Sequence, residues 1–447
     1  MTKRQWARGW SRRLAALVVV AALWLGTMST VMAHQTAWGQ GESEGDDLVI
    51  SLITFSPGDD IAQWFGHTAV AVRDTRLNES RVYNYGMFSL DGDDLLVHFA
   101  MGRLWFWVGS APKAATIRAY ARQDRDVRQI ELNLPAYKRL EVAEFLADNV
   151  RPENRDYLYH HYDDNCATRV RDVIDLAVDG QLKDAYFDEP GRMTLREHTR
   201  RHSQHLAPMD WLLMFLMNSS IDDPSTVWEE MFLPAELEKR VLEFEWEDSS
   251  GEVRALSLRE HELNRAEDRD PIPQEPTAHW PWWLLIGLAV GAVALLIGWN
   301  SRRRPGRWSR IGYGSYHLVV GLFLGLPGLT LGVMAVATDH TVTYWNQNLF
   351  WANPATLLVA AVALMVLRGS LRGRRWMVLL WLGLAALALI GVAVNIAGFG
   401  LASLYQDTSS AMALMLPIIL GAAASAWVVD GHLLREEVGD GGDDEES

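Results

Sequence analysis

The first half of the chain alternates short apolar runs with polar turns, which predicts a mixed α/β domain. Leu48 to Phe55 is a continuous apolar run that ends at Ser56-Pro57-Gly58, a pattern typical of a buried strand followed by a turn. Alternating or short extended apolar patterns predict further strands over 67–72, 82–85, 104–108 and 127–132. Helical spacing predicts helices over 95–101, 113–122, 140–150 and 166–177. We expect the remainder, to about residue 263, to be mostly helical.

The second half is dominated by long apolar segments. They lie at 280–299, 315–337, 349–368, 376–397 and 411–430. Each is close to the ~20 residues that an α-helix needs to cross a bilayer. Residues 264–279 are rich in charge and proline, which is typical of a semi-rigid linker. The sequence therefore predicts a folded domain over 48–263, a linker over 264–279 and an all-α, five-helix transmembrane domain over 280–430.

The loops between these segments predict the orientation. Arginines crowd the loops after the first and third segments, and the other two loops contain no Lys or Arg. By the positive-inside rule the arginine-rich loops are cytoplasmic, which places the 48–263 domain outside the cytoplasm and the acidic tail, 431–447, inside it. We therefore expect a multi-pass protein of the bacterial inner membrane with a periplasmic domain. Tryptophans near the predicted membrane boundaries are typical of an aromatic belt: Trp280, Trp282, Trp283, Trp299, Trp345, Trp351 and Trp376.

The N-terminus resembles an export signal. A cluster of basic residues within 3–13 precedes the apolar stretch Leu14 to Leu25, and Val31-Met32-Ala33 supplies small residues for cleavage. This predicts a signal peptide over 1–33, with an uncleaved anchor as the alternative. Residues 34–47 are polar and glycine-rich, which indicates a flexible lead-in.

Charge and cysteine content narrow the function classes. The chain carries 41 basic and 56 acidic side chains, a net charge of −15, so nucleic acid is not an expected partner. A single cysteine excludes an internal disulfide framework. His198 and His202 are spaced i,i+4, but arginines crowd the same stretch, which favours a solvated face or a contact with anionic headgroups over a metal site. We expect neither a metal nor a cofactor.

Cys166 is the main candidate for chemistry. It follows His160-His161-Tyr162-Asp163-Asp164-Asn165, a polar run in which Asp164 or Asn165 caps the helix that begins at the cysteine. The unpaired N–H groups of a first helical turn stabilise a thiolate, the form that attacks carbonyl carbon. The alternative is that Cys166 is only a small buried apolar residue.

A base for this thiol is expected at His67. It opens a predicted strand, from which its ring projects toward a helix packed on the sheet. Asn84, on the neighbouring predicted strand, is a candidate for orienting the imidazole. The alternatives are that His67 is a structural histidine, that Asn84 serves a turn, or that a polar residue within 160–164 orients His67 instead.

The motifs around these residues resemble known thiol enzymes. A strand histidine followed much later by Asn-Cys at a helix start is similar to the circularly permuted papain-like enzymes, which include relatives of the NlpC/P60 peptidases and the lecithin:retinol acyltransferase group. The combined motifs resemble the Lnb-type lipoprotein N-acyltransferase family more closely. In the first half of the chain these motifs are Phe65-Gly66-His67-Thr68, Tyr83-Asn84-Tyr85-Gly86, Asp164-Asn165-Cys166-Ala167-Thr168-Arg169 and Met231-Phe232-Leu233-Pro234. Between the second and third apolar segments they are Asp339-His340, Asn346-Gln347-Asn348-Leu349 and Asn353-Pro354.

The resemblance implies a permuted papain-like α+β periplasmic domain and a specific reaction. A phospholipid would donate an acyl chain to Cys166, and the N-terminal amine of a lipoprotein would accept it, with His67 as base and Asn84 as its orienting residue. The motifs also make substrate-binding candidates of Asn165, Arg169, Tyr83, Tyr85, His340, Asn346 and Asn348. Two other functions stay open: a periplasmic cysteine amidase or peptidase acting on peptidoglycan peptides, and a non-enzymatic envelope scaffold.

Overall fold

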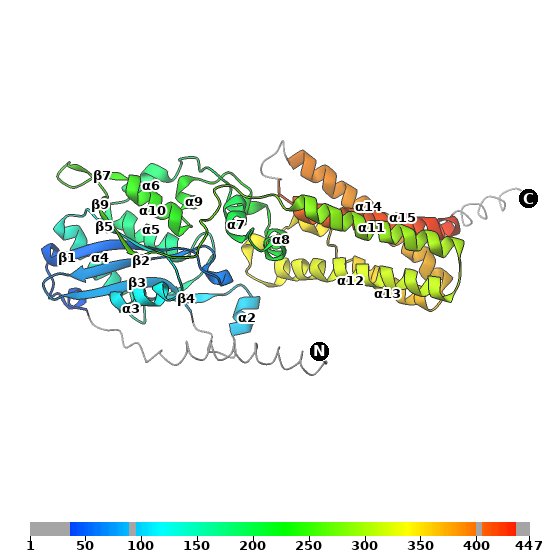
Figure 1. Cartoon of the computed structure of the whole chain (residues 1–447), viewed down its shortest axis with the longest axis horizontal. Helices are drawn as coiled ribbons and strands as arrows, with labels where there is room; N and C mark the ends of the chain where they lie inside the picture. The colour runs from blue at the N-terminus through cyan, green and yellow to red at the C-terminus, as the bar shows by residue number, and fades with distance from the viewer. Residues whose placement is uncertain (1–35, 89–94, 399–404, 435–447) are drawn as a thin grey trace, which may run out of the picture.

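The computed structural model describes residues 36–88, 95–398 and 405–434, which form a sheet-containing domain followed by a helical domain (Figure 1). The predicted signal peptide, the first residues of the lead-in and all but the start of the acidic tail lie outside the described residues.

The first domain is built on a seven-stranded antiparallel sheet. The strand order is β6-β4-β3-β2-β1-β5-β9. Its members are β1 (Leu48–Phe55), β2 (His67–Asp74), β3 (Glu79–Met87), β4 (Trp105–Pro112), β5 (Val127–Leu132), β6 (Asp156–Leu158) and β9 (Ser257–Asn264). All residues of the central strand β1 are buried except Val49, which is half-buried. The apolar run of β1 is continuous because both faces of the sheet are covered at this strand.

Helices cover both faces of this sheet (Figure 1). The helices of the domain are α2 (Leu95–Ala100), α3 (Lys113–Ala121), α4 (Ala136–Asn149), α5 (Cys166–Ala177), α6 (Gln181–Tyr186), α7 (Leu195–Ser203), α8 (Ala207–Leu216), α9 (Val227–Glu230) and α10 (Pro234–Glu243). The main core lies between the sheet and α4, α5 and α10. A smaller core lies under α3, on the other face. The strands and helices predicted before residue 178 are confirmed.

The prediction that the chain is mostly helical up to residue 263 is wrong at its end. Helices α6 to α10 occupy much of the stretch, but a hairpin of β7 (Glu245–Glu247) and β8 (Val253–Ala255) follows, and then β9 pairs with β5 at the sheet edge. Most of β9 is exposed and charged, as suits an edge strand, and it therefore lacks the apolar alternation that marks a strand in sequence.

The second domain consists of α11 (Trp280–Arg303), α12 (Arg307–Ala337), α13 (Thr356–Leu367), α14 (Leu371–Gly398) and α15 (Ser409–Asp430). Four of these helices are long and apolar enough to cross a membrane. Helix α13 has 12 residues, a length of about 18 Å. The predicted third segment therefore contains a helix shorter than a span, because Asn353-Pro354 disfavours helix and residues 347–350 form a 3₁₀ turn instead.

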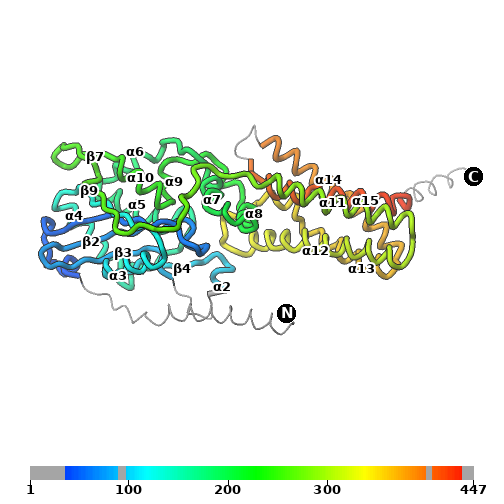
Figure 2. Tube along the Cα trace, viewed as in Figure 1, coloured from blue at the N-terminus to red at the C-terminus, as the bar shows by residue number. Residues whose placement is uncertain are grey.

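Glycines bring α11 and α15 into direct backbone contact. A Cβ at Gly291 would lie 2.5 Å from the carbonyl oxygen of Pro417, so only glycine allows this approach. At the end of the bundle far from the sheet, Arg374 pairs with Asp430, and Nη1 of Arg302 donates to the Val428 carbonyl at 3.0 Å. The described C-terminal residues and both arginine-rich loops therefore share one end of the bundle (Figure 2).

Candidate active site

Asn165 fixes Cys166 at the first position of α5. Its side-chain oxygen accepts hydrogen bonds from the N–H groups of Ala167 (2.8 Å) and Thr168 (3.0 Å), and the Thr168 hydroxyl accepts the Asn165 N–H in return. Its amide nitrogen donates to the carbonyls of His161 (2.7 Å) and Phe232 (3.0 Å). All its polar groups are thus engaged within the fold, so we assign Asn165 to holding the thiol.

His67 is the first residue of β2 and belongs to an aromatic cluster. Its ring stacks on Phe55, the last residue of β1, at 5.6 Å and on Tyr120 of α3 at 5.9 Å. Its Nε2 lies 3.3 Å from the side-chain oxygen of Asn84. Because that oxygen only accepts hydrogen bonds, Nε2 carries the hydrogen and Nδ1 keeps its lone pair. This is the tautomer in which Nδ1 accepts a proton.

Cys166 lies against the start of β2, the strand that His67 opens. Its thiol faces the backbone N–H of Thr68, the residue that follows His67. A Cβ at Gly86, two residues after Asn84, would lie 3.7 Å from the Cβ of Cys166. The structure therefore places the three predicted catalytic residues together, where the paired part of β2 and β3 ends.

Desolvation acts on the pKa values of both half-buried residues. It raises the pKa of the Cys166 thiol, although the N–H groups of Thr68, Ala167 and Cys166 and the Arg125 guanidinium favour the thiolate. Burial and, to a lesser degree, Arg125 lower the pKa of His67 to about 4, against the opposing effect of Asn84. The N–H groups of the first helical turn therefore favour the thiolate, as expected, but desolvation has the larger effect on the pKa of the thiol.

The sequence did not point to Arg125, a buried cation beside the site. It sits in the turn before β5, with Nε donating to the Ser56 carbonyl at 2.5 Å and its guanidinium 4.7 Å from the Tyr120 ring centre. Its Nη2 is buried and has no hydrogen-bond partner among the described residues. In the sequence, Arg125 stands among alternating charges typical of a surface turn.

Tyr157 on β6 is a second residue that the motifs did not include. Its hydroxyl is buried and unpartnered within the described part of the chain. A Cβ at Gly86 would lie 4.0 Å from this hydroxyl, so both Cys166 and Tyr157 border the space that glycine leaves open. Burial raises the pKa of Tyr157, with a contribution from Cys166, which keeps the hydroxyl protonated and able to donate.

The other candidates of the sheet domain make contacts within the fold. The Tyr83 hydroxyl accepts from the Trp38 indole at 2.8 Å, and the Tyr85 hydroxyl donates to Asn149 at 2.6 Å, both in the core. Arg169 pairs with Asp164, and its guanidinium lies 4.4 Å from the ring centre of Tyr157. Arg169 therefore holds one wall of the site.

The three candidates of the helical domain lie at its junction with the sheet domain. Asn346 donates to the carbonyls of Phe215 (3.0 Å) and Leu216 (2.9 Å), and Asn348 donates to that of Phe215 (2.8 Å). His340 Nε2 lies 3.0 Å from the Phe99 carbonyl. These residues join the loop after α12 to α8 and α2, far in sequence from both.

His198 and His202 are buried, so the prediction of a solvated or headgroup-binding face is wrong. His198 Nε2 lies 2.8 Å from a carboxylate oxygen of Glu230, and His202 Nδ1 lies 2.8 Å from the His198 carbonyl oxygen. Within residues 36–88, 95–398 and 405–434 no group of three or more His, Cys, Asp or Glu side chains is arranged to hold a metal ion.

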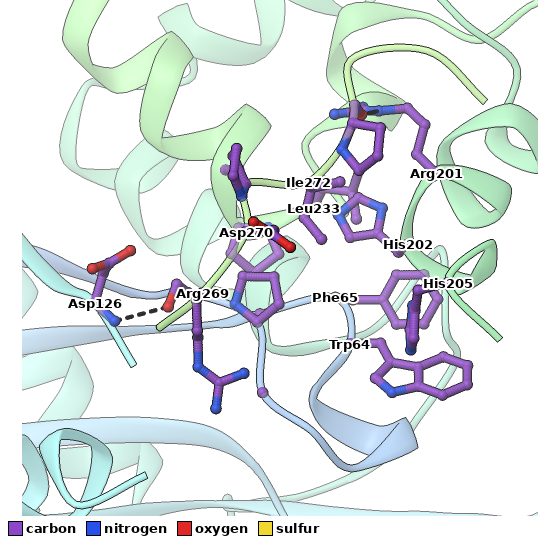
Figure 3. A pocket seen from close by; sticks show the side chains of 18 of the residues that line it. Trp64, Phe65, Asp126, Arg201, His202, His205, Leu233, Arg269, Asp270 and Ile272 are labelled. Atoms are coloured by element: carbon purple, nitrogen blue, oxygen red, sulfur yellow. Dashed lines mark hydrogen bonds between the residues drawn. The ribbon is translucent and has the colours of Figure 1, made fainter. Parts of the chain in front are cut away.

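A cavity of about 970 Å³ lies beside the end of β2 that begins with His67 (Figure 3). Phe65 and Gly66, which precede His67, form part of its wall, and residues 268–274 of the connecting segment form another part. It extends to His279, which precedes α11. Trp64 and His205 meet edge to face at 4.6 Å on one side of it (Figure 3). Neither His67 nor Cys166 lines the cavity.

The fold and the site define a membrane protein with a cysteine–histidine–asparagine site on a sheet-containing domain. Two family models match the chain: the Lnb N-terminal periplasmic domain over residues 34–201 and the Lnb transmembrane domain over residues 278–416. The chain belongs to the Lnb-type family, as the motifs predicted. No curated protein and no solved structure matched the chain.

Proposed function

We propose that this protein is a thiol acyltransferase that moves an acyl chain from a phospholipid, through a thioester on Cys166, to the N-terminal amine of a lipoprotein. The observation that carries the proposal is the contact of His67 Nε2 with Asn84, beside a cysteine held at a capped helix start. A cysteine helix packed on an antiparallel sheet that carries the histidine also suits the permuted papain-like arrangement.

In the first step, His67 Nδ1 takes the proton of Cys166 as the sulfur attacks the ester carbonyl. The ester C–O bond breaks, the acyl chain remains on sulfur as a thioester, and His67 gives the proton to the departing lysolipid oxygen. A neutral imidazole is required, and the lowered pKa of His67 keeps it neutral near pH 7.

In the second step, the lipoprotein amine attacks the thioester carbonyl and gives a proton to His67. The C–S bond breaks, an amide forms, and the proton returns to the Cys166 sulfur. No water enters either step, so the enzyme must favour the amine over water as acceptor. The partial burial of the thiol and the imidazole supports this selectivity.

Both steps develop negative charge on the carbonyl oxygen. We assign its stabilisation to the N–H groups of Thr68 and Cys166 and to the hydroxyl of Tyr157, which border the thiol. Arg125 adds a positive charge nearby.

We place the sheet domain in the periplasm and the C-terminus in the cytoplasm. The arginine-rich loops lie at the end of the bundle far from the sheet, as the positive-inside rule requires for this orientation. Donor and acceptor lipids of the outer leaflet would then lie next to the site.

The test uses the full chain in vesicles that contain phospholipid with isotopically heavy acyl chains. Acid-quenched protein is digested and analysed by mass spectrometry for a heavy acyl group on the Cys166 peptide that neutral hydroxylamine removes. We expect this adduct in the wild type and in His261→Ala, an exposed control on β9, and its loss in His67→Ala. Addition of a lipopeptide with a free N-terminal amine should transfer the heavy acyl chain to that amine.

Three results would contradict parts of the proposal. An unmodified Cys166 under all conditions would rule out covalent acyl transfer. Release of the acyl chain as free fatty acid at the same rate with and without lipopeptide would favour a hydrolase. Acylation of the amine without incorporation of heavy label would leave a transferase but exclude the phospholipid as donor.

A further inference from the structure

We infer that α2 and the start of β4 form a membrane-inserted element that contacts the acyl chains of the outer leaflet beside the bundle. The inference goes beyond the proposed function, and only its final step, delivery of lipid to Cys166, rests on that function.

Polar contacts with the loop that follows α12 hold α2 at the membrane boundary. The Asp339 N–H donates to the Met101 carbonyl at 2.8 Å, and Arg103 Nε donates to the Asp339 carboxylate at 2.6 Å. His340 Nε2 contacts the Phe99 carbonyl oxygen at 3.0 Å. Because α12 ends at Ala337, these contacts fix α2 at the level where a membrane-spanning helix ends (Figure 1).

Large apolar side chains of this region face outward rather than into a core. Their exposed fractions are Val97 59%, Phe99 60% and Trp105 59% on α2 and β4, and Val336 86% and Trp345 91% at the end of α12 and in the loop after it. Val336 belongs to the last turn of a candidate span, so its exposed side chain meets lipid. Phe99 of α2 lies against His340 in the loop after α12, so the exposed apolar side chains of α2 lie beside this lipid-facing helix end, which points to lipid as the occupant.

Aromatic rings connect this surface to the reactive site. Phe88 is 41% exposed, and its ring stacks at 5.1 Å on the ring of Phe106 on β4, which in turn stacks on Tyr159 at 4.4 Å. Phe106 also pairs with Tyr157 in the register of β4 and β6. Tyr157 and Cys166 border the same space beside Gly86. Burial, with a smaller contribution from Cys166, raises the pKa values of both Tyr157 and Tyr159. An acyl chain that leaves the bilayer at α2 would follow an aromatic surface toward the thiol.

The test measures depth in the membrane without requiring activity. The chain has one cysteine, so a Cys166→Ser background allows a single environment-sensitive dye at Phe99→Cys, with Val97→Cys as a second position. The matched control is Val253→Cys, which is 62% exposed on the β7–β8 hairpin at the far end of the sheet domain (Figure 1). The proteins are reconstituted in vesicles that contain lipids with a nitroxide high on the acyl chain.

We expect a blue-shifted emission and several-fold stronger nitroxide quenching at residues 97 and 99 than at residue 253. Equal, weak quenching at all three positions would overturn the inference. Since this background lacks the nucleophile, the result does not depend on whether the acyl-transfer proposal is correct.

A second experiment tests lipid delivery with Cys166 present. We expect Phe99→Glu to slow acylation of Cys166 from vesicle phospholipid by about tenfold or more, because a charge replaces an apolar side chain in the bilayer. Acylation by a water-soluble short-chain ester should be unchanged. An equal loss with both donors would contradict a role at the bilayer and place the effect in the site itself.

Discussion

His67 Nε2 and the side-chain oxygen of Asn84 lie 3.3 Å apart, across two neighbouring strands at the point where the paired register of β2 and β3 ends. The contact selects the imidazole tautomer whose Nδ1 is unprotonated. Together with the stacking on Phe55 and Tyr120, it opposes rotation of the ring.

Replacement of Asn84 should therefore slow the chemical step more than substrate binding. We expect Asn84→Ala to lower kcat roughly 10- to 100-fold with little change in KM, because the base remains but its tautomer and orientation are no longer fixed. Steady-state kinetics of acyl transfer measure both constants. Asn133→Ala, which removes an exposed side-chain amide just after β5, is the control. An unchanged kcat for Asn84→Ala would remove Asn84 from the mechanism.

The rate at which the Cys166 thiol is alkylated tests whether burial raises its pKa. Cys166 is the only cysteine, so the rate of alkylation by iodoacetamide reports on it alone. Because burial raises its pKa above the ordinary 9.0, alkylation should be slow at pH 7 and should still be rising above pH 9. Arg125→Leu should move this profile to higher pH, since the guanidinium favours the thiolate. The exposed Arg265→Leu is the control. A wild-type midpoint below pH 8 would show that burial does not dominate.

The Tyr157 hydroxyl tests the assignment of the oxyanion donors. Tyr157→Phe keeps the ring beneath Arg169 and removes only an oxygen that has no partner among the described residues. We expect kcat to fall by about 10²-fold without a lower melting temperature. Tyr137→Phe, which loses an exposed hydroxyl, should behave as wild type. Activity of Tyr157→Phe within twofold of wild type would exclude the hydroxyl from catalysis.

Replacement of Arg196 tests whether its contacts stabilise the region where the two domains meet. This buried guanidinium forms two hydrogen bonds with Asp222, at 2.6 and 2.8 Å, and donates to the carbonyls of Met214, Met217 and Asn218 after and within α8. Arg196→Leu leaves the Asp222 carboxylate buried and unpaired, which costs about 3–5 kcal/mol. Thermal unfolding in detergent should show a clear loss of stability, whereas Arg76→Leu, at an exposed ion pair, should not. An unchanged melting temperature for Arg196→Leu would contradict this role.

Local patterns predicted the elements whose apolar spacing is strong. Strand β1 and helix α5 appear with the predicted bounds, because both bury a regular apolar face. Strand β9 was not predicted, since it is a charged edge strand whose pairing with β5 depends on contacts more than 120 residues apart. The short α13 was predicted as a longer segment, because composition alone does not register the Asn353-Pro354 interruption.

The site was predictable in part for the same reason. Cys166, His67 and Asn84 stand in recognisable local motifs. Arg125 and Tyr157 reach the site only through the folding of distant segments: Arg125 because β5 lies beside β1, and Tyr157 because β6 pairs with β4. No local sequence pattern predicts that Arg125 and Tyr157 lie near Cys166.

Acyl transfer through Cys166 can be measured by mass spectrometry of lipoprotein N-terminal peptides from a strain that depends on this protein for N-acylation. Wild type is compared with Cys166→Ala at equal protein level. We expect an amide-linked acyl chain on the N-terminal cysteine in the wild type and a free α-amine in the variant. Full N-acylation in the variant would rule out a thioester on Cys166 as the intermediate, because the chain has no other cysteine.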